Sequence, residues 1–125
     1  MSACPFCTVP PGRLTHDSPL ALAFPDAFPV TPGHTLLITR RHVPTFFDTT
    51  PDEQAALLSA LSAVKLALDA AHHPDGYNVA FNAGAAAGQT VMHAHIHVIP
   101  RYAGDVPDPR GGVRGVIPGR QKYGP

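Results

Sequence analysis

The sequence predicts an α+β domain in which an antiparallel sheet packs against one dominant helix. Short apolar runs bounded by Pro, Gly and Asp predict strands, and so does a segment near residue 95 in which polar and apolar residues alternate. A single long segment, residues 50–72, carries helix start signals and apolar residues at helical spacing. The 125 residues are enough for one hydrophobic core and too few for two. Residues 1–125 are therefore expected to form a single domain.

The first half of the chain predicts a hairpin followed by the helix. Leu20–Phe24 and Thr35–Thr39 are apolar runs that should pair through the turn-rich connection between them. Thr50 supplies an N-cap hydroxyl, Pro51 takes the first helical position and Glu53 lies three residues after the cap. Apolar residues then recur at helical spacing at Leu57, Leu61, Val64 and Leu68, and the helix should end near His72, before Pro74-Asp75-Gly76.

The second half of the chain contains two predicted strands joined by a loop of small residues. Tyr77–Asn82 alternates, and Ala83–Gly88 is a flexible run of Ala and Gly. The last strand, His93–Ile99, has a period of two. Its alternation places His93, His95 and His97 on one face and Ala94, Ile96 and Val98 on the other. The apolar face can enter the core, which leaves three imidazoles in a row, each about 7 Å from its neighbour.

Composition and charge exclude several classes of function. Nine Lys and Arg balance nine Asp and Glu, so the chain lacks the diffuse positive field that gathers nucleic acid or an anionic membrane. The apolar stretch at residues 55–71 is interrupted by Ser59, Ser62, Lys65 and Asp69, and the first ten residues lack a secretory pattern. We therefore expect no nucleic-acid partner, no membrane association and a cytoplasmic location.

Three interpretations of the alternating histidines remain open on the residues alone. They could be polar residues on a solvated face, although an imidazole exposes a titratable group that a fold does not need. They could hold a catalytic metal, but three successive alternate residues span about 13 Å, so at most two could bind one ion. In the third interpretation the histidines divide the work, and His95 and His97 face a substrate while His93 binds zinc.

The zinc interpretation involves the only two cysteines of the chain. Cys4 and Cys7 give the chelating spacing of a Cys-x-x-Cys pair, and His42 and His93 could complete a tetrahedral shell with no vacant position. Such a closed shell is typical of a structural site. Two reduced, idle thiols are the main alternative. A thioredoxin-like redox pair is disfavoured because no strand precedes the pair and no helix signal follows it.

The segment His93-Ala94-His95-Ile96-His97-Val98-Ile99 matches the His-φ-His-φ-His-φ-φ signature of the histidine triad superfamily, where φ is an apolar residue. Further matches at the family's spacings are Leu22-Ala23-Phe24-Pro25-Asp26, Pro32-Gly33-His34, Leu36-Leu37-Ile38 and Gly88-Gln89-Thr90-Val91. The tail, residues 100–105 and 108–114, resembles bacterial members with a zinc knuckle. The resemblance implies a histidine triad fold with a sheet of about five strands, one main helix and a homodimer that continues the sheet across its interface.

The resemblance also implies a role for each matching residue. His95 would be the nucleophile that takes the nucleoside monophosphate, His97 would lie against the transferring phosphate, and His34 would support the cluster from the neighbouring strand. Asp26 resembles the residue that holds the ribose hydroxyls. Residues that would line the nucleotide phosphates and the leaving-group path are Asn82, Gly88, Gln89 and Thr90. The implied zinc ligands are Cys4, Cys7, His42 and His93.

The resulting hypothesis is a hydrolase that cleaves small adenosine nucleotide conjugates at the α-phosphate through an AMP-histidine intermediate, with structural zinc and no catalytic cofactor. Diadenosine polyphosphates are favoured because the segments around Gln89 and Arg101 resemble the fragile histidine triad branch, from which the cysteine pair departs. The alternatives are an AMP phosphoramidate hydrolase of the same family, a nucleotide-binding or sensing protein without turnover, and a hydrolase with zinc at the triad. A neutral imidazole is a competent nucleophile when a hydrogen bond to its other nitrogen fixes the tautomer.

Overall fold

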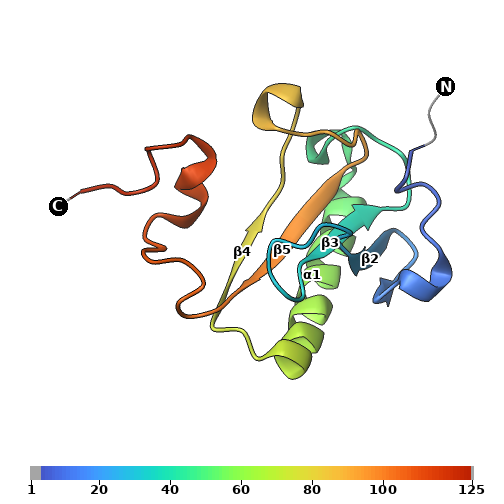
Figure 1. The fold of residues 1–125 in the computed structure, drawn as a ribbon. Coiled ribbons are helices and arrows are strands. Elements are labelled where there is room, and N and C mark those ends of the chain that lie inside the picture. The colour runs from blue at the N-terminus through green and yellow to red at the C-terminus, as the bar shows by residue number, and fades with distance from the viewer. Residues whose placement is uncertain (1–3, 125) are drawn as a thin grey trace.

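The computed structural model describes residues 4–124, and within them a five-stranded sheet packs against one long helix (Figure 1). The sheet order is β1-β2-β3-β5-β4, and every neighbouring pair is antiparallel. The strands are β1 (His16–Asp17), β2 (Ala21–Pro25), β3 (Thr35–Thr39), β4 (Gly76–Ala80) and β5 (His95–Arg101), and the long helix is α1 (Pro51–His72). Four short 3-10 turns, Pro11–Arg13, Phe46–Asp48, Ala85–Ala87 and Gly112–Val116, complete the described elements. The predicted α+β architecture is confirmed.

Helix α1 begins at the residue that the sequence indicates. The Thr50 hydroxyl accepts the backbone N–H of Glu53 at 3.1 Å, and the Glu53 carboxylate accepts the backbone N–H of Thr50 at 2.9 Å. This capping box satisfies two N–H groups that have no partner inside the helix. The helix ends at His72, and the next residue, His73, caps it with a left-handed φ of 50° that stops further helical hydrogen bonding.

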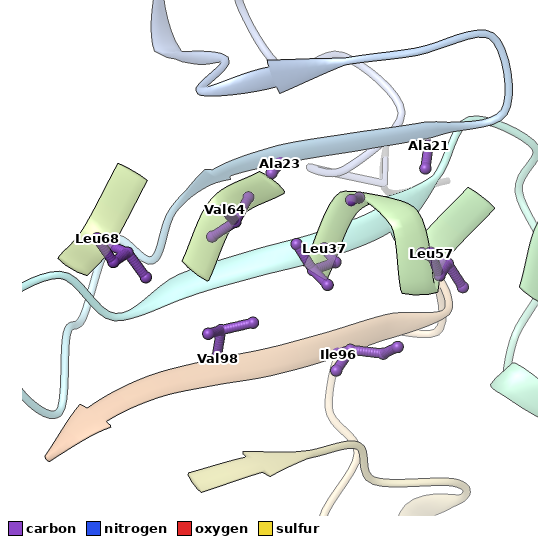
Figure 2. Close-up of a cluster of buried hydrophobic side chains, with 9 residues drawn as sticks. Ala21, Ala23, Leu37, Leu57, Val64, Leu68, Ile96 and Val98 are labelled. Atoms are coloured by element: carbon purple, nitrogen blue, oxygen red, sulfur yellow. The ribbon is translucent and has the colours of Figure 1, made fainter. Parts of the chain in front are cut away.

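The two faces of the sheet carry different residues. Helix α1 covers one face, where its apolar stripe packs on alternate strand residues (Figure 2). Members of this core are Ala21, Ala23, Leu37, Leu57, Ala60, Val64, Leu68, Ile96 and Val98. Each fully buried Leu or Val contributes roughly 1.5–3 kcal/mol. By length and composition alone α1 could cross a membrane, but here its apolar stripe faces the sheet. The other face carries the smaller cluster Phe24, Leu36 and Ile38.

The structure corrects the ends of the predicted strands. The strand expected at Tyr77–Asn82 spans Gly76–Ala80, and the one expected at Leu20–Phe24 spans Ala21–Pro25. The last strand, expected from His93, begins at His95 and continues to Arg101. A contact between segments far apart in the sequence causes this shift, since the backbone N–H of Ala94 donates to the carbonyl of Val43, in the loop after β3. His93 therefore precedes the strand and its side chain is fully buried.

Candidate active site

A pocket of about 510 Å³ opens on the face of the sheet that α1 leaves uncovered. Residues from the N-terminal segment, β2, β3, β5 and the loop before β5 line it. It brings together all eight residues for which the sequence predicts a catalytic or nucleotide-binding role: Asp26, His34, Asn82, Gly88, Gln89, Thr90, His95 and His97. The four predicted metal ligands lie together in a separate cluster.

His95 is the first residue of β5, and one hydrogen bond fixes which of its ring nitrogens carries the proton. Its Nδ1 lies 2.7 Å from the carbonyl oxygen of His93. A carbonyl oxygen can only accept, so Nδ1 donates and the lone pair of the neutral ring is left on Nε2. The side chain is half-buried and lines the pocket. This arrangement meets the condition that a histidine nucleophile requires.

A relay of hydrogen bonds fixes the tautomers of the other two pocket histidines. The backbone N–H of Val30 donates to Nδ1 of His34 at 3.0 Å, so the proton of His34 is on Nε2. That nitrogen lies 3.0 Å from Nδ1 of His97 and donates to it. His97 therefore accepts on Nδ1 and keeps its own proton on Nε2, as a donor. In a pocket that binds phosphate, such a donor stabilises charge on a non-bridging oxygen.

The pKa values of His34 and His97 are both lowered. Burial is the largest cause in each case, because it penalises the charged imidazolium. The neighbouring rings of His95 and His34 lower the pKa of His97 further. Asp26 opposes both shifts through its negative charge. Both rings are therefore neutral at pH 7, which is the state that the relay of single protons needs.

The Asp26 carboxylate contacts both the turn that follows β2 and the rings of His34 and His97. Its Oδ1 accepts the backbone N–H of Phe28 at 2.8 Å, which is the hydrogen bond of an Asx turn. Its Oδ2 lies 3.4 Å from Nε2 of His34 and 4.0 Å from Nδ1 of His97. Gly33 holds this loop close to the helix end, since a Cβ there would meet a carbon of His72 at 3.0 Å.

Asp26, His34 and His97 also place three potential ligand atoms within 4.8 Å of one another. Hydrogen bonding disfavours a metal at this place. His34 already accepts a hydrogen bond on Nδ1, so a metal on Nε2 would require either loss of the Val30 contact or a ring without a proton. The pocket cluster, defined as Asp26, His34, His95 and His97, is therefore suited to proton placement and not to metal binding.

Gln89 shapes the loop between β4 and β5. Its side-chain oxygen accepts the backbone N–H of Gly84 at 2.8 Å, and its side-chain nitrogen donates to the carbonyls of Pro44 and Val91. Both of its amide protons are thus used within the protein, so the side chain orders the loop and has no spare donor for a phosphate. Gly88, with a φ of 96°, lines the pocket next to it. Asn82 and Thr90 line the same pocket.

The thiol cluster, defined as Cys4, Cys7, His42 and His93, places one ligand atom from each residue within 4.8 Å of the others. Sγ of Cys7 lies 3.3 Å from Nδ1 of His42, Sγ of Cys4 lies 3.5 Å from Nδ1 of His93, and the two Nδ1 atoms are 3.3 Å apart. Ligands held at zinc–nitrogen and zinc–sulfur bond lengths on a tetrahedron are separated by about 3.3–3.8 Å. The four residues therefore fit zinc.

His93 has the tautomer that a metal ligand needs. Its Nε2 donates to the carbonyl of Thr39 at 2.6 Å, which leaves the lone pair of Nδ1 directed at the thiols. The ring is fully buried, and burial is the main reason why its pKa is lowered. A neutral ring with a supported second nitrogen is typical of a metal-binding histidine.

Several pocket residues were missed by the sequence interpretation. Phe6 contributes an aromatic wall, with its ring centroid 5.1 Å from that of His95. Arg13 places its guanidinium 5.5 Å from the Phe24 ring and donates to the carbonyl of Pro25 at 3.0 Å. Val30 contributes only its backbone N–H to the relay. Phe6 could have been found because it lies between the two cysteines, whereas an isolated Arg and a backbone N–H carry no sequence signal.

Comparison with known proteins agrees with this geometry. The family model for the HIT domain matches residues 8–104. An uncharacterised HIT-like protein of Saccharolobus solfataricus is 36% identical over 106 residues, which cover 82% of this chain and 76% of that protein. The bifunctional bis(5'-adenosyl)-triphosphatase/adenylylsulfatase of Arabidopsis thaliana is 37% identical over 97 residues, which cover 78% of this chain and 54% of that protein.

The fold is shared with solved structures as well. A Zn-bound histidine triad family protein from Mycobacterium smegmatis superposes with a TM-score of 0.75 at 35% identity, over 85% of this chain and 84% of that one. Some relatives are nucleotide hydrolases by name, while others are uncharacterised. The family match over most of the chain, the shared fold and the relatives above 30% identity lead to one conclusion: the chain belongs to the histidine triad (HIT) family.

Proposed function

We propose that this protein is a nucleoside phosphohydrolase that cleaves adenosine nucleotide conjugates at the α-phosphate through a covalent AMP-histidine intermediate on His95. The observation that carries the proposal is the hydrogen bond from Nδ1 of His95 to the carbonyl of His93, which leaves Nε2 unprotonated in the pocket. Relatives with hydrolase names support the reaction class.

In the first step the lone pair on Nε2 of His95 attacks the α-phosphorus. A nitrogen–phosphorus bond forms, the bond from phosphorus to the bridging atom of the leaving group breaks, and that atom departs with the electron pair. The ring becomes cationic, and the carbonyl of His93 stabilises it through the proton that Nδ1 keeps. The Nε2–H of His97 can donate to phosphate oxygen as negative charge develops there.

In the second step water attacks the same phosphorus. A phosphorus–oxygen bond forms, the phosphorus–nitrogen bond breaks and its electron pair returns to Nε2 of His95. The proton of the water goes to solvent, AMP leaves, and the neutral ring is restored with its Nδ1–H still bound to His93. Covalent catalysis of this kind divides one difficult displacement into two easier ones. Within this scheme the chain's own residues supply the nucleophile and the donor.

Diadenosine polyphosphates are the substrates that we propose first. An AMP-amine conjugate and adenylylsulfate are the competing classes, the latter because relatives carry adenylylsulfatase in their names. The experiment compares kcat/KM for diadenosine tetraphosphate, an AMP-amine conjugate and adenylylsulfate at matched enzyme concentrations. A preference for diadenosine tetraphosphate is expected. Turnover of none of the three, with AMP still bound, would favour a sensing protein and overturn the proposal.

The thiol cluster is proposed to hold a structural zinc ion. Ligand geometry, the His93 tautomer and the Zn-bound relative from Mycobacterium smegmatis support this assignment. Cys4 and Cys7 would bind as thiolates, with His42 and His93 through their Nδ1 atoms. The ion would tie the N-terminal segment to the end of the sheet. By resemblance to the family, we also propose a homodimer in the cytoplasm.

A further inference from the structure

The segment that contains both cysteines also forms part of the nucleotide pocket. Pro5, Phe6 and Val9 line the pocket, and Phe6 lies between the ligands Cys4 and Cys7. The Phe6 ring meets His95 edge-on at 5.1 Å between centroids, and it meets His93 at 6.1 Å. One aromatic side chain therefore contacts a proposed metal ligand and the proposed nucleophile at once.

Few other contacts hold this segment in place. Within the described part of the chain, residues 4–9 make one backbone hydrogen bond, from the N–H of Cys7 to the carbonyl of Cys4, and it lies inside the segment itself. The other described contacts of the segment are those of the two thiols with His42 and His93, the edge-on contacts of the Phe6 ring, and the packing of Phe6 and Val9 on the cluster around Phe24. A metal that binds both thiols would fix both ends of the Phe6 turn.

A second connection runs through the backbone. The side chain of His93 belongs to the thiol cluster, while its carbonyl accepts the Nδ1–H of His95 at 2.7 Å. A metal that orders His93 thus also orders the group that aims the nucleophile. Both connections join the thiol cluster to the same side of the pocket.

From these contacts we infer that Phe6 is a positioning residue that couples metal binding at the thiol cluster to nucleoside monophosphate binding in the pocket. The inference rests on the proposed function for the identity of the ligand. The metal holds Phe6 against His95, so this part of the pocket wall is already ordered before the nucleotide binds. The nucleotide then binds more tightly, because none of its binding free energy is needed to order Phe6. By linkage, the nucleotide must raise the metal affinity by the same factor.

The test measures binding and does not depend on turnover. The dissociation constant of AMP is measured by calorimetry with zinc-loaded and zinc-stripped protein, at a temperature where circular dichroism shows both to be folded. Zinc is expected to lower the dissociation constant of AMP about tenfold, which is within the usual range of coupling between sites. In the reciprocal titration, AMP should lower the dissociation constant of zinc by the same factor of about ten.

Phe6→Ala removes the ring and leaves all four metal ligands in place. Its coupling factor should fall below about twofold in both titrations. Phe6→Trp should restore the coupling, and because the chain contains no other Trp, its fluorescence should respond to zinc and to AMP separately. The matched control is Phe28→Ala, which alters an exposed ring of the same pocket on the connection between β2 and β3, away in the sequence from the segment with the thiols. It should weaken AMP binding equally in both zinc states.

Undiminished coupling in Phe6→Ala, or AMP binding by the wild-type protein that zinc does not change, would overturn the inference. Coupling that persists in a protein without hydrolytic activity would overturn the proposed function alone. Failure of AMP to bind in either zinc state would overturn both.

Discussion

His93 and His95 are two residues apart, yet their hydrogen bonds are reversed. In the thiol cluster, His93 donates from Nε2 to the carbonyl of Thr39 and turns Nδ1 toward the thiols. In the pocket cluster, His95 donates from Nδ1 to the carbonyl of His93 and leaves Nε2 free. A backbone carbonyl thus decides which nitrogen keeps the proton, which leaves the lone pair of His93 on Nδ1 beside the thiols and that of His95 on Nε2.

The two clusters also differ in what completes them. Thiols complete the first cluster, whose four ligand atoms suit the closed tetrahedral shell of the proposed zinc ion. In the second, the Asp26 carboxylate faces two rings whose protons are already assigned by Val30 and His34. The comparison teaches that a group of close histidines is a metal site only when each ring offers a lone pair to a common point.

The largest effect is expected from the pocket cluster. His95→Gly should lower kcat by at least about 10³-fold, as removal of a covalent nucleophile does. Melting temperature should change little, since the ring is half-buried and has one hydrogen bond to the protein. Steady-state hydrolysis with and without added imidazole checks both points. Partial rescue by imidazole is expected, whereas wild-type rates in the variant would rule out His95 as the nucleophile.

Metal removal should affect the thiol cluster first through stability. Zinc at about a thousand times its dissociation constant adds about 4 kcal/mol to the free energy of unfolding, so chelation should lower the melting temperature by about 10–20 °C. His42→Ala should have a similar effect. The matched control His72→Ala, at an exposed position on α1, should have none. An unchanged melting temperature together with abolished activity would instead indicate zinc at the triad.

A smaller effect separates the two roles of Asp26. Asp26→Asn keeps an oxygen for the Asx turn with Phe28 and removes the charge. If the carboxylate holds ribose hydroxyls, the variant should lose about 1.5 kcal/mol, or roughly tenfold in kcat/KM, for adenosine conjugates. The loss in kcat/KM should be smaller for 2'-deoxy substrates, and the affinity for zinc should not change. Equal losses for both sugars would show that the charge acts on the rings of His34 and His97 and not on the ribose. No loss for either sugar would assign Asp26 to the turn alone.

The smallest expected effect is on the pH dependence of stability. Burial lowers the pKa of His34 and His97 below the ordinary value of 6.5. Between that value and the lowered pKa, the unfolded chain therefore binds more protons than the folded chain. Stability is therefore complete above about pH 6.5 and falls as the pH is lowered further. Melting temperatures of the zinc-loaded protein from pH 7.5 to 5 measure this fall. His34→Asn should make it shallower, and an equal or steeper fall would contradict the assignment.

Local signals in the sequence account for much of the fold. Thr50 and Glu53 mark the start of α1, and the alternation around Ile96 separates the core face from the pocket face because both depend on neighbouring residues. The start of β5 could not be predicted, since it depends on a hydrogen bond from Ala94 to distant Val43. For the same reason the sequence did not reveal that the side-chain nitrogen of Gln89 donates to the carbonyls of Pro44 and Val91.

In the candidate site, too, some features could be predicted from the sequence and others depend on contacts that only folding brings together. Resemblance to the family and residue type grouped the histidines correctly in space, but which nitrogen of each ring carries a proton depends on backbone groups brought close by folding. Val30 reaches His34, and the carbonyl of Thr39 reaches His93, only in the folded chain. No residue type encodes either contact.

The most direct test of the account is mass spectrometry of the protein quenched during turnover of diadenosine tetraphosphate, followed by peptide mapping under conditions that preserve phosphorus–nitrogen bonds. The account predicts one added AMP group, on His95, and none in His95→Gly. An AMP group on another residue, or zinc bound at His95 in the active protein, would contradict it.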